Sequence, residues 1–241
     1  MTVSAWQDTS RDPGREPGRN PGRRPDWGGQ DPPPREPVFN APPQALVLVG
    51  LIIGGYALQS VLPGDMILRL FAFFPAGLPY GRWETLATAL FVHGGWAHAL
   101  MNAAFALAFG APLARFFGPR LSGWLWFYGF YLVCGVGANL AFYALHASST
   151  AALVGASGAI SGLMGAACRL LGGHGRVGRL TSRPVVTMGL VLLGVNVAVA
   201  VLGSAFVPGA GGAAIAWEAH VAGFALGVLL LAPVARLAGR A

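Results

Sequence analysis

The chain has 241 residues, of which 54% are hydrophobic and only 10% are charged, with a mean hydropathy of +0.57 and a net charge of +7. Soluble domains carry about 25% charged residues, so this composition excludes an ordinary soluble fold and indicates a protein with several membrane-spanning segments. The basic residues are spread over several short segments without a nucleic-acid-binding motif, so we expect no nucleic-acid partner.

Residues 1–42 form a tail of distinct composition. An Arg-x-Pro-Gly unit occurs at 11–14, 15–18 and 19–22, and the tail balances six arginines with six acids. Such a segment cannot bury a core, so we expect it to be disordered. The chain therefore divides into a disordered tail, 1–42, and a membrane domain, 43–241.

The membrane domain contains six apolar runs that are long enough to cross a bilayer. They cover residues 45–62, 96–117, 121–145, 151–171, 185–207 and 213–235. The apolar segment from Ile67 to Pro79 is too short to span, and we expect a partly immersed loop there. The predicted fold is an all-α bundle of six transmembrane helices with this loop between the first two.

Arginine placement predicts the orientation, because cytoplasmic loops are enriched in basic residues. With the N-terminus inside, fourteen arginines lie on the inner side and only Arg69 and Arg82 on the outer side. Both termini are therefore expected in the cytoplasm. All basic residues are arginine, which suggests a GC-rich bacterial genome and hence a bacterial inner membrane.

Three of the predicted helices carry polar residues near their outer ends. Ser157 lies in Gly-Ala-Ser-Gly at 155–158, His220 lies in the last run, and His98 and Asn102 lie in the second. At a rise of about 1.5 Å per residue, His98, Ser157 and His220 come within roughly 10 Å of the outer surface. Polar groups are costly in lipid and are usually retained for function, so we expect these residues to act together.

The helices of Ser157 and His220 have small residues at four-residue spacing, which lets their backbones approach closely. These residues are Gly158, Gly162 and Ala166 in one helix and Ala219, Gly223 and Gly227 in the other. Close packing would bring the hydroxyl of Ser157 within about 2.6–3.2 Å of an imidazole nitrogen of His220, as an activated nucleophile requires. His220 would take the hydroxyl proton and return it to the leaving amine.

The sequence predicts a Ser–His dyad rather than a triad. Outside the tail the acids are Asp65, Glu84 and Glu218; the first two lie in the outer loop, and Glu218 points away from His220 on a helix. His98 and Asn102 share a helical face, and with the backbone N–H of Ser157 they could form an oxyanion hole.

These motifs resemble those of the rhomboid intramembrane serine proteases. The resemblance rests on the sequence from Phe91 to Asn102, on Gly-x-Ser-Gly at 155–158, and on Ala219-His220 with the glycines that follow, and it covers about 80–240. It implies a six-helix core, Ser157 as nucleophile and His220 as base.

The same resemblance implies His98 and Asn102 as oxyanion stabilisers. It also implies substrates that are transmembrane segments of other proteins in the lipid bilayer, cut near their outer ends at small residues. We expect no cofactor and no metal site.

The sequence departs from the family pattern at three places. Arg82 precedes Trp83, where the family often has the reverse order. Ala114 stands where a glutamate often ends the second helix, and Ser161 stands where many members have an aromatic that stacks on the catalytic imidazole.

Other function classes fit the sequence less well. A six-helix transporter would need an embedded charged relay, and a metalloprotease using His93, His98 and His220 would need a carboxylate base that those faces lack. The lack of any aspartate in the middle of a predicted helix excludes an aspartyl intramembrane protease. A non-catalytic rhomboid-like protein that binds transmembrane helices typically lacks the serine or the histidine. Asn139 and Asn196 are expected to make interhelical hydrogen bonds.

Overall fold

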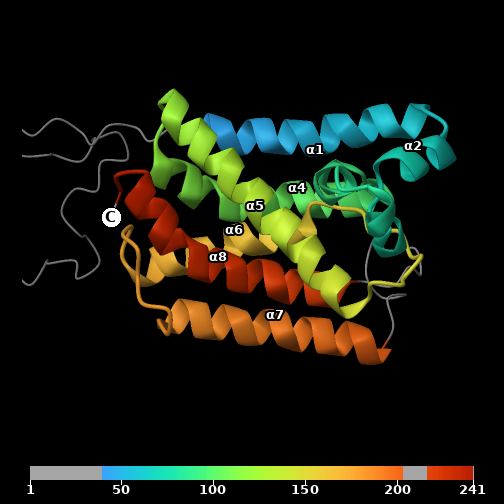
Figure 1. Ribbon diagram of the computed structural model, residues 1–241. Helices are drawn as coiled ribbons and strands as arrows, with labels where there is room; N and C mark the ends of the chain where they lie inside the picture. Colours follow the sequence, from blue (N-terminus) through green and yellow to red (C-terminus); the bar gives the residue numbers. More distant parts are fainter. Residues whose placement is uncertain (1–39, 203–215, 241) are drawn as a thin grey trace, which may run out of the picture. The chain divides into compact units, whose positions relative to one another are not determined.

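The computed structural model describes residues 40–202 and 216–240, which form a bundle of helices (Figure 1). In chain order the elements are α1 (Pro43–Val61), α2 (Gly64–Phe71), the 3-10 turn η1 (Pro75–Tyr80), α3 (Thr85–Thr88), the 3-10 turn η2 (Ala89–Phe91), α4 (Trp96–Phe117), α5 (Leu121–Leu145), α6 (Ser157–Gly172), α7 (Arg183–Leu202) and α8 (Trp217–Leu237). The all-helical class predicted from sequence is confirmed. The predicted disordered tail lies, except for its last residues, outside the described part of the chain.

Five of the helices are long and apolar enough to cross a membrane by length and composition, namely α1, α4, α5, α7 and α8. The predicted bounds 96–117 and 121–145 coincide with those of α4 and α5. The remaining predicted span, 151–171, corresponds to α6, which has only 16 residues and extends about 24 Å at 1.5 Å per residue. That length is shorter than a hydrocarbon core of about 30 Å.

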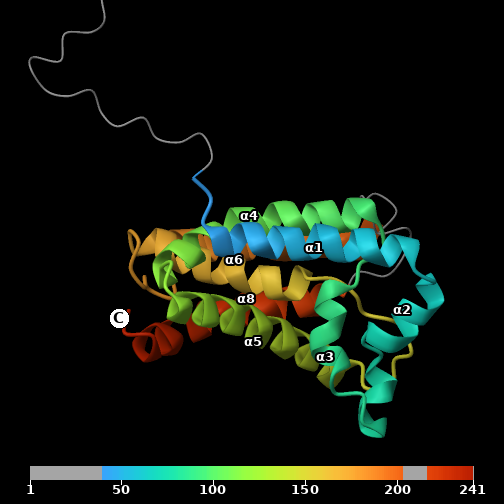
Figure 2. The same ribbon diagram turned by 90° about the horizontal axis from the view of Figure 1, so that it is seen from above.

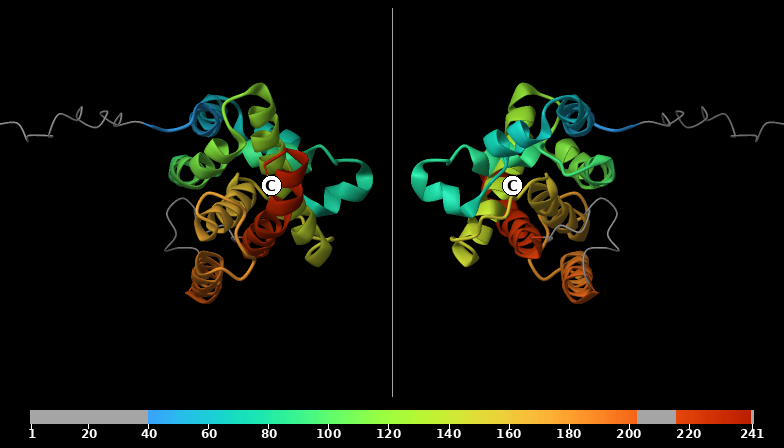
Figure 3. Two further views of the ribbon diagram at one scale, coloured as in Figure 1. Left: turned by 90° about the vertical axis from the view of Figure 1, so that its left-hand side faces the viewer. Right: turned by 90° about the vertical axis from the view of Figure 1, so that its right-hand side faces the viewer.

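α6 is the central helix of the bundle (Figure 3). It is buried continuously from Gly158 to Leu170, which is the pattern of a helix covered on all sides. Its most extensive partner is α8, and α4, α5 and α7 also pack against it. This central helix begins at Ser157, the serine of the Gly-Ala-Ser-Gly motif.

Glycines allow α6 and α8 to approach until their backbones touch. A methyl group at Gly223 would collide with the carbonyl oxygen of Gly158, and one at Gly227 would collide with that of Gly162. The close packing predicted from the small-residue spacing is therefore present, and it fixes the register of the two helices.

The start of α6 differs from the sequence prediction, which placed a helix from residue 151. The backbones of Phe73 and Leu153 pair in an antiparallel bridge with N···O distances of 3.0 and 2.8 Å. The N–H of Gly155 donates to Ala89 O at 2.9 Å. These bonds hold the segment that ends at Gly155 in a non-helical conformation, although its apolar composition alone resembles that of a helix.

The segment between α1 and α4 is also more structured than the predicted loop. It contains α2, η1, α3 and η2 and lies at the end of the bundle remote from the C-terminus (Figure 2). Arg82 organises it: its guanidinium donates to Glu84 Oε1 at 2.7 Å and to the carbonyl oxygens of Arg69 and Leu70 at 3.2 and 2.7 Å. The reversed order of Arg82 and Trp83 therefore leaves the arginine able to cap α2. The same hydrogen bond from Arg82 lowers the pKa of Glu84.

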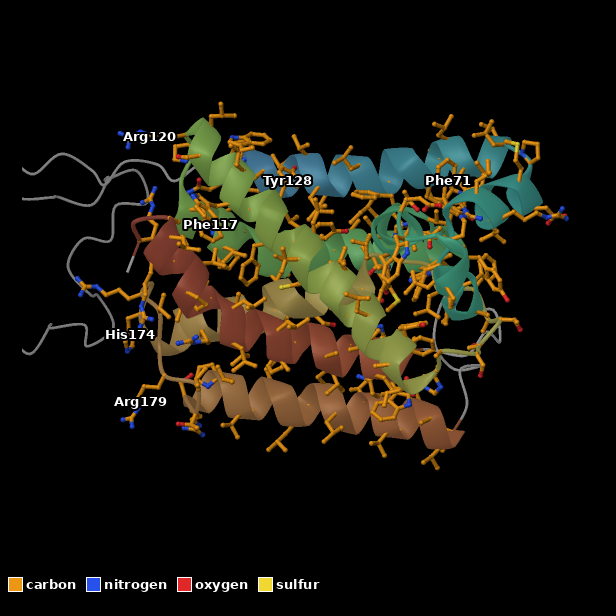
Figure 4. The ribbon with its side chains drawn as sticks, in the orientation of Figure 1. Phe71, Phe117, Arg120, Tyr128, His174 and Arg179 are labelled. Carbon is orange, nitrogen blue, oxygen red and sulfur yellow. The ribbon has the colours of Figure 1, made fainter. Side chains whose placement is uncertain are left out.

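At the opposite end of the bundle, side chains donate hydrogen bonds to the carbonyl groups at the end of α4 and of the residue that follows it. Gln44 Nε2 donates to Gly118 O at 2.8 Å, and Arg240 Nη2 donates to Phe117 O at 2.7 Å. These bonds satisfy carbonyls that a helix end leaves without partners. Figure 4 shows Arg120, His174 and Arg179 at this end, far from Phe71 at the other.

Candidate active site

The side chains of Ser157 and His220 meet between α6 and α8. His220 Nε2 lies 2.8 Å from Ser157 Oγ, within the range that an activated nucleophile requires. Both residues lie in the first turn of their helices and at the same end of the bundle. The close α6–α8 contact through Gly158 and Gly223 brings them within hydrogen-bonding distance.

Gly155 shapes the turn that presents Ser157. Its φ is 116°, a region in which residues with a side chain are strained. A Cβ at this position would also lie 2.7 Å from the imidazole of His98. Gly155 therefore allows the backbone before the serine to turn sharply and to pass close to the ring of His98.

Because α6 begins at Ser157, the backbone N–H groups of Ser157 and Gly158 have no partner within the helix. The positive end of the helix dipole lies at this end of α6. A helix starting at residue 151, as predicted, would have used these donors internally. The non-helical segment before α6 thus leaves these two backbone donors outside the internal hydrogen bonds of the helix.

His98 and Asn102 lie one turn apart on α4 and face Gly155. A Cβ on Gly155 would lie 2.7 Å from His98 Nε2 and 3.7 Å from Asn102 Nδ2. The N–H of Gly94 donates to His98 Nδ1 at 3.4 Å, which leaves the proton of a neutral ring on Nε2. His98 and Asn102, which the sequence groups with Ser157 and His220, therefore lie beside the residues that lead into Ser157.

The side-chain amide of Asn102 is a buried donor. Asn102 is only 4% exposed, and among the described residues its Nδ2 has no hydrogen-bond partner. Buried polar groups are nearly always satisfied, but buried atoms of His93, Tyr131 and Ser182 also lack a partner here. The amide of Asn102 differs from the last two in lying beside Gly155, two residues before Ser157.

His93 lies behind His98 and closes this side of the site. It is 1% exposed, and its ring is 5.2 Å from that of His98 in an edge-to-face arrangement. Gln59 of α1 bonds both the carbonyl oxygen and the N–H of His93, at 2.7 and 3.0 Å. Desolvation by burial lowers the pKa of His93 to about 4, so the ring is neutral and supports His98 by packing.

The acids outside the tail do not bond His220. Glu218 lies two residues before it and pairs with His146, the residue after α5, with an Oε1 to Nε2 distance of 2.9 Å. Asp65 and Glu84 lie in the segment between α1 and α4. In the described part of the chain, no His, Cys, Asp or Glu residues form a group of three that could hold a metal ion.

One further side chain contacts His220, and the sequence does not predict it as part of the site. Asn196 of α7 lies with its Oδ1 3.1 Å from His220 Nδ1. The sequence predicts an interhelical hydrogen bond at Asn196, and the structure contains one. Its partner is set by the packing of α7 against α8, which the local sequence does not encode.

A family model described as Rhomboid domain matches residues 80–237, from the end of η1 to the last residue of α8. The match includes the helices that carry His98, Asn102, Ser157 and His220. A search of curated proteins found no match to this chain. The chain is thus an integral membrane protein that belongs to the rhomboid family, whose members are generally serine proteases acting within membranes.

Proposed function

We propose that this protein is a serine endopeptidase that cleaves transmembrane segments of other membrane proteins near the outer face of the bilayer. The observation that carries the proposal is the 2.8 Å contact between Ser157 Oγ and His220 Nε2 at the start of two apolar helices. A hydroxyl bonded to an unprotonated imidazole nitrogen is a competent nucleophile.

In the proposed reaction, Ser157 Oγ attacks the scissile carbonyl carbon while its proton moves to His220 Nε2. The C–N bond of the tetrahedral intermediate then breaks, and the leaving amine takes that proton. Water hydrolyses the resulting acyl-enzyme through the same residues and regenerates the serine. A neutral imidazole is therefore needed at the start of each half-reaction.

The oxyanion of the tetrahedral intermediate would be stabilised by the backbone N–H of Ser157, by Asn102 Nδ2 and by His98 Nε2. Asn102 is buried with an unpartnered donor among the described residues. Preorganised donors of this kind usually make the largest single contribution to acyl transfer.

Asn102→Ala is expected to lower kcat by about 10²- to 10³-fold, the cost of one oxyanion donor. The labelling of Ser157 by a small fluorophosphonate should fall less, since the dyad is intact. Gln44→Ala, which removes a buried amide at the far end of the bundle, is the matched control and should retain turnover. Full-rate cleavage by Asn102→Ala would remove this residue from the mechanism.

We further propose that both termini lie in the cytoplasm and that the membrane is a bacterial inner membrane. The arginines at the end of the bundle that contains Arg120 and Arg179 (Figure 4) support this orientation through the positive-inside rule. The active site then faces the outer side, where water can reach it.

The proposal is tested with the purified full chain in proteoliposomes and a model transmembrane substrate that has small residues near its outer end. Cleavage, together with loss of cleavage after fluorophosphonate treatment, is expected. The competing function is a non-catalytic rhomboid-like protein that binds transmembrane helices. Binding of the substrate without cleavage or labelling would favour it.

A further inference from the structure

The catalytic imidazole is held at both nitrogens. Its Nε2 contacts Ser157 on α6, and its Nδ1 lies 3.1 Å from Asn196 Oδ1 on α7. Asn196 is 4% exposed, and it and Val185 are the buried residues of α7. A helix whose other side chains are exposed or only partly buried thus places an amide directly against the ring of His220.

The orientation of the Asn196 amide follows from its second bond. Asn196 Nδ2 lies 2.7 Å from the carbonyl oxygen of Leu192, one turn earlier in α7. A carbonyl only accepts, so the NH₂ group must face Leu192 and the oxygen must face His220. The reverse orientation would place two acceptors together at Leu192 and lose that bond.

This orientation determines the tautomer of His220. Because Asn196 Oδ1 is an acceptor, His220 Nδ1 must carry a proton to bond it. In a neutral imidazole Nε2 is then unprotonated, and it can accept the hydrogen of Ser157. The chain of donors therefore runs from Ser157 Oγ to His220 Nε2 and from His220 Nδ1 to Asn196 Oδ1.

We propose that Asn196 is the positioning residue of the active site, which fixes the tautomer and the ring plane of His220 for the protease function proposed above. When the proton of Ser157 moves to Nε2, the ring becomes an imidazolium whose Nδ1–H still bonds Asn196. The amide stabilises that charge by its dipole and carries none itself. Cys-His-Asn proteases use an asparagine in the same position relative to the base.

No carboxylate takes this place among the described residues. Glu218 on α8 is bonded to His146, the residue after α5, and Glu84 is bonded to Arg82. The imidazoles on this side are those of His98 on α4 and of His93 behind it. A neutral amide suits an environment in which an additional buried charge would be costly. The Ser–His dyad expected from sequence is thus completed by an uncharged third residue from α7.

The first test replaces the amide by a side chain that cannot bond His220. Asn196→Leu is expected to lower kcat by about 10- to 100-fold, the effect of losing a hydrogen bond to a group that becomes charged. KM should stay the same, because Nδ1 is on the side of the ring away from Ser157. Gln44→Leu is the matched control, since it removes a buried amide bonded to Gly118 at the far end of the bundle, and it should retain wild-type kcat.

The second test retains the acceptor and adds charge. In Asn196→Asp the carboxylate should raise the pKa of the catalytic imidazole. The base must be unprotonated to act, so the acidic limb of the kcat/KM profile is expected to move to higher pH, by about one unit or more. An asparagine that only packs α7 against α8 predicts no such shift.

A third measurement does not depend on turnover. In protein with ¹⁵N-labelled histidine, the His220 signal, identified by its loss in His220→Ala, should show protonation at Nδ1 in the wild type. Asn196→Leu should give a mixture of tautomers. Wild-type kcat in Asn196→Leu, an unchanged acidic limb in Asn196→Asp, or an unchanged tautomer would each overturn the positioning role. A wild-type protein that neither cleaves nor labels would instead refute the protease function, and the tautomer measurement would still decide the role of Asn196.

Discussion

Ser157→Ala and His220→Ala are each expected to lower kcat by about 10⁶-fold, the loss seen when one member of a serine–histidine pair is removed. The hydroxyl is a weak nucleophile without its base, and the base has no proton to take without the hydroxyl. The double variant should be no worse than either single variant, because the two groups act as a unit.

Ser161→Ala is the matched control for this prediction. Ser161 lies one turn after Ser157 in the same helix and is 7% exposed. Ser161→Ala therefore also removes one hydroxyl group from α6. It should insert and cleave as the wild type does. Rates are measured with purified protein in proteoliposomes, with insertion checked by protease protection. Substantial cleavage by Ser157→Ala would contradict the assignment of the nucleophile.

Gly223→Leu is expected to abolish detectable cleavage and to lower the melting temperature. A side chain at Gly223 meets the carbonyl oxygen of Gly158, so α8 must move away from α6. A displacement of about 1 Å can cost roughly a hundredfold in rate, and a leucine requires more. Overpacking of this kind costs about 1–3 kcal/mol of stability, and backbone contacts place it at the upper end.

Gly129→Leu is the control for Gly223→Leu. Gly129 lies in α5, and a Cβ there has no atom within 4 Å, so leucine fits without moving a helix. Activity and thermal unfolding in detergent are measured for both variants. Wild-type activity in Gly223→Leu would show that this backbone contact does not hold Ser157 and His220 together.

Much of this fold follows from hydropathy, and the exceptions have identifiable causes. The bounds of α4 and α5 were predicted to the residue because long apolar runs end at Gly118 and His146. The start of α6 was wrong by six residues, because the pairing of Leu153 with Phe73 is a contact between distant segments that composition does not reveal. α2 was missed because eight residues are too few for a hydropathy signal.

The site could be predicted in part. Ser157, His220, His98 and Asn102 lie in motifs whose spacing places them at one end of three helices, and the structure brings them together. The place of Asn196 could not be predicted, because it depends on the rotation of α7 about its own axis. An apolar helix with one asparagine indicates that the amide has a partner, but only packing identifies it as His220.

The most direct test of the central claim is to map the adduct of a fluorophosphonate probe on the intact protein by mass spectrometry. The Ser157–His220 contact predicts one adduct, on the peptide that contains Ser157, with labelling abolished in His220→Ala and retained in Ser161→Ala. An adduct at another residue, or cleavage of a transmembrane substrate by a protein that the probe does not modify at Ser157, would contradict it.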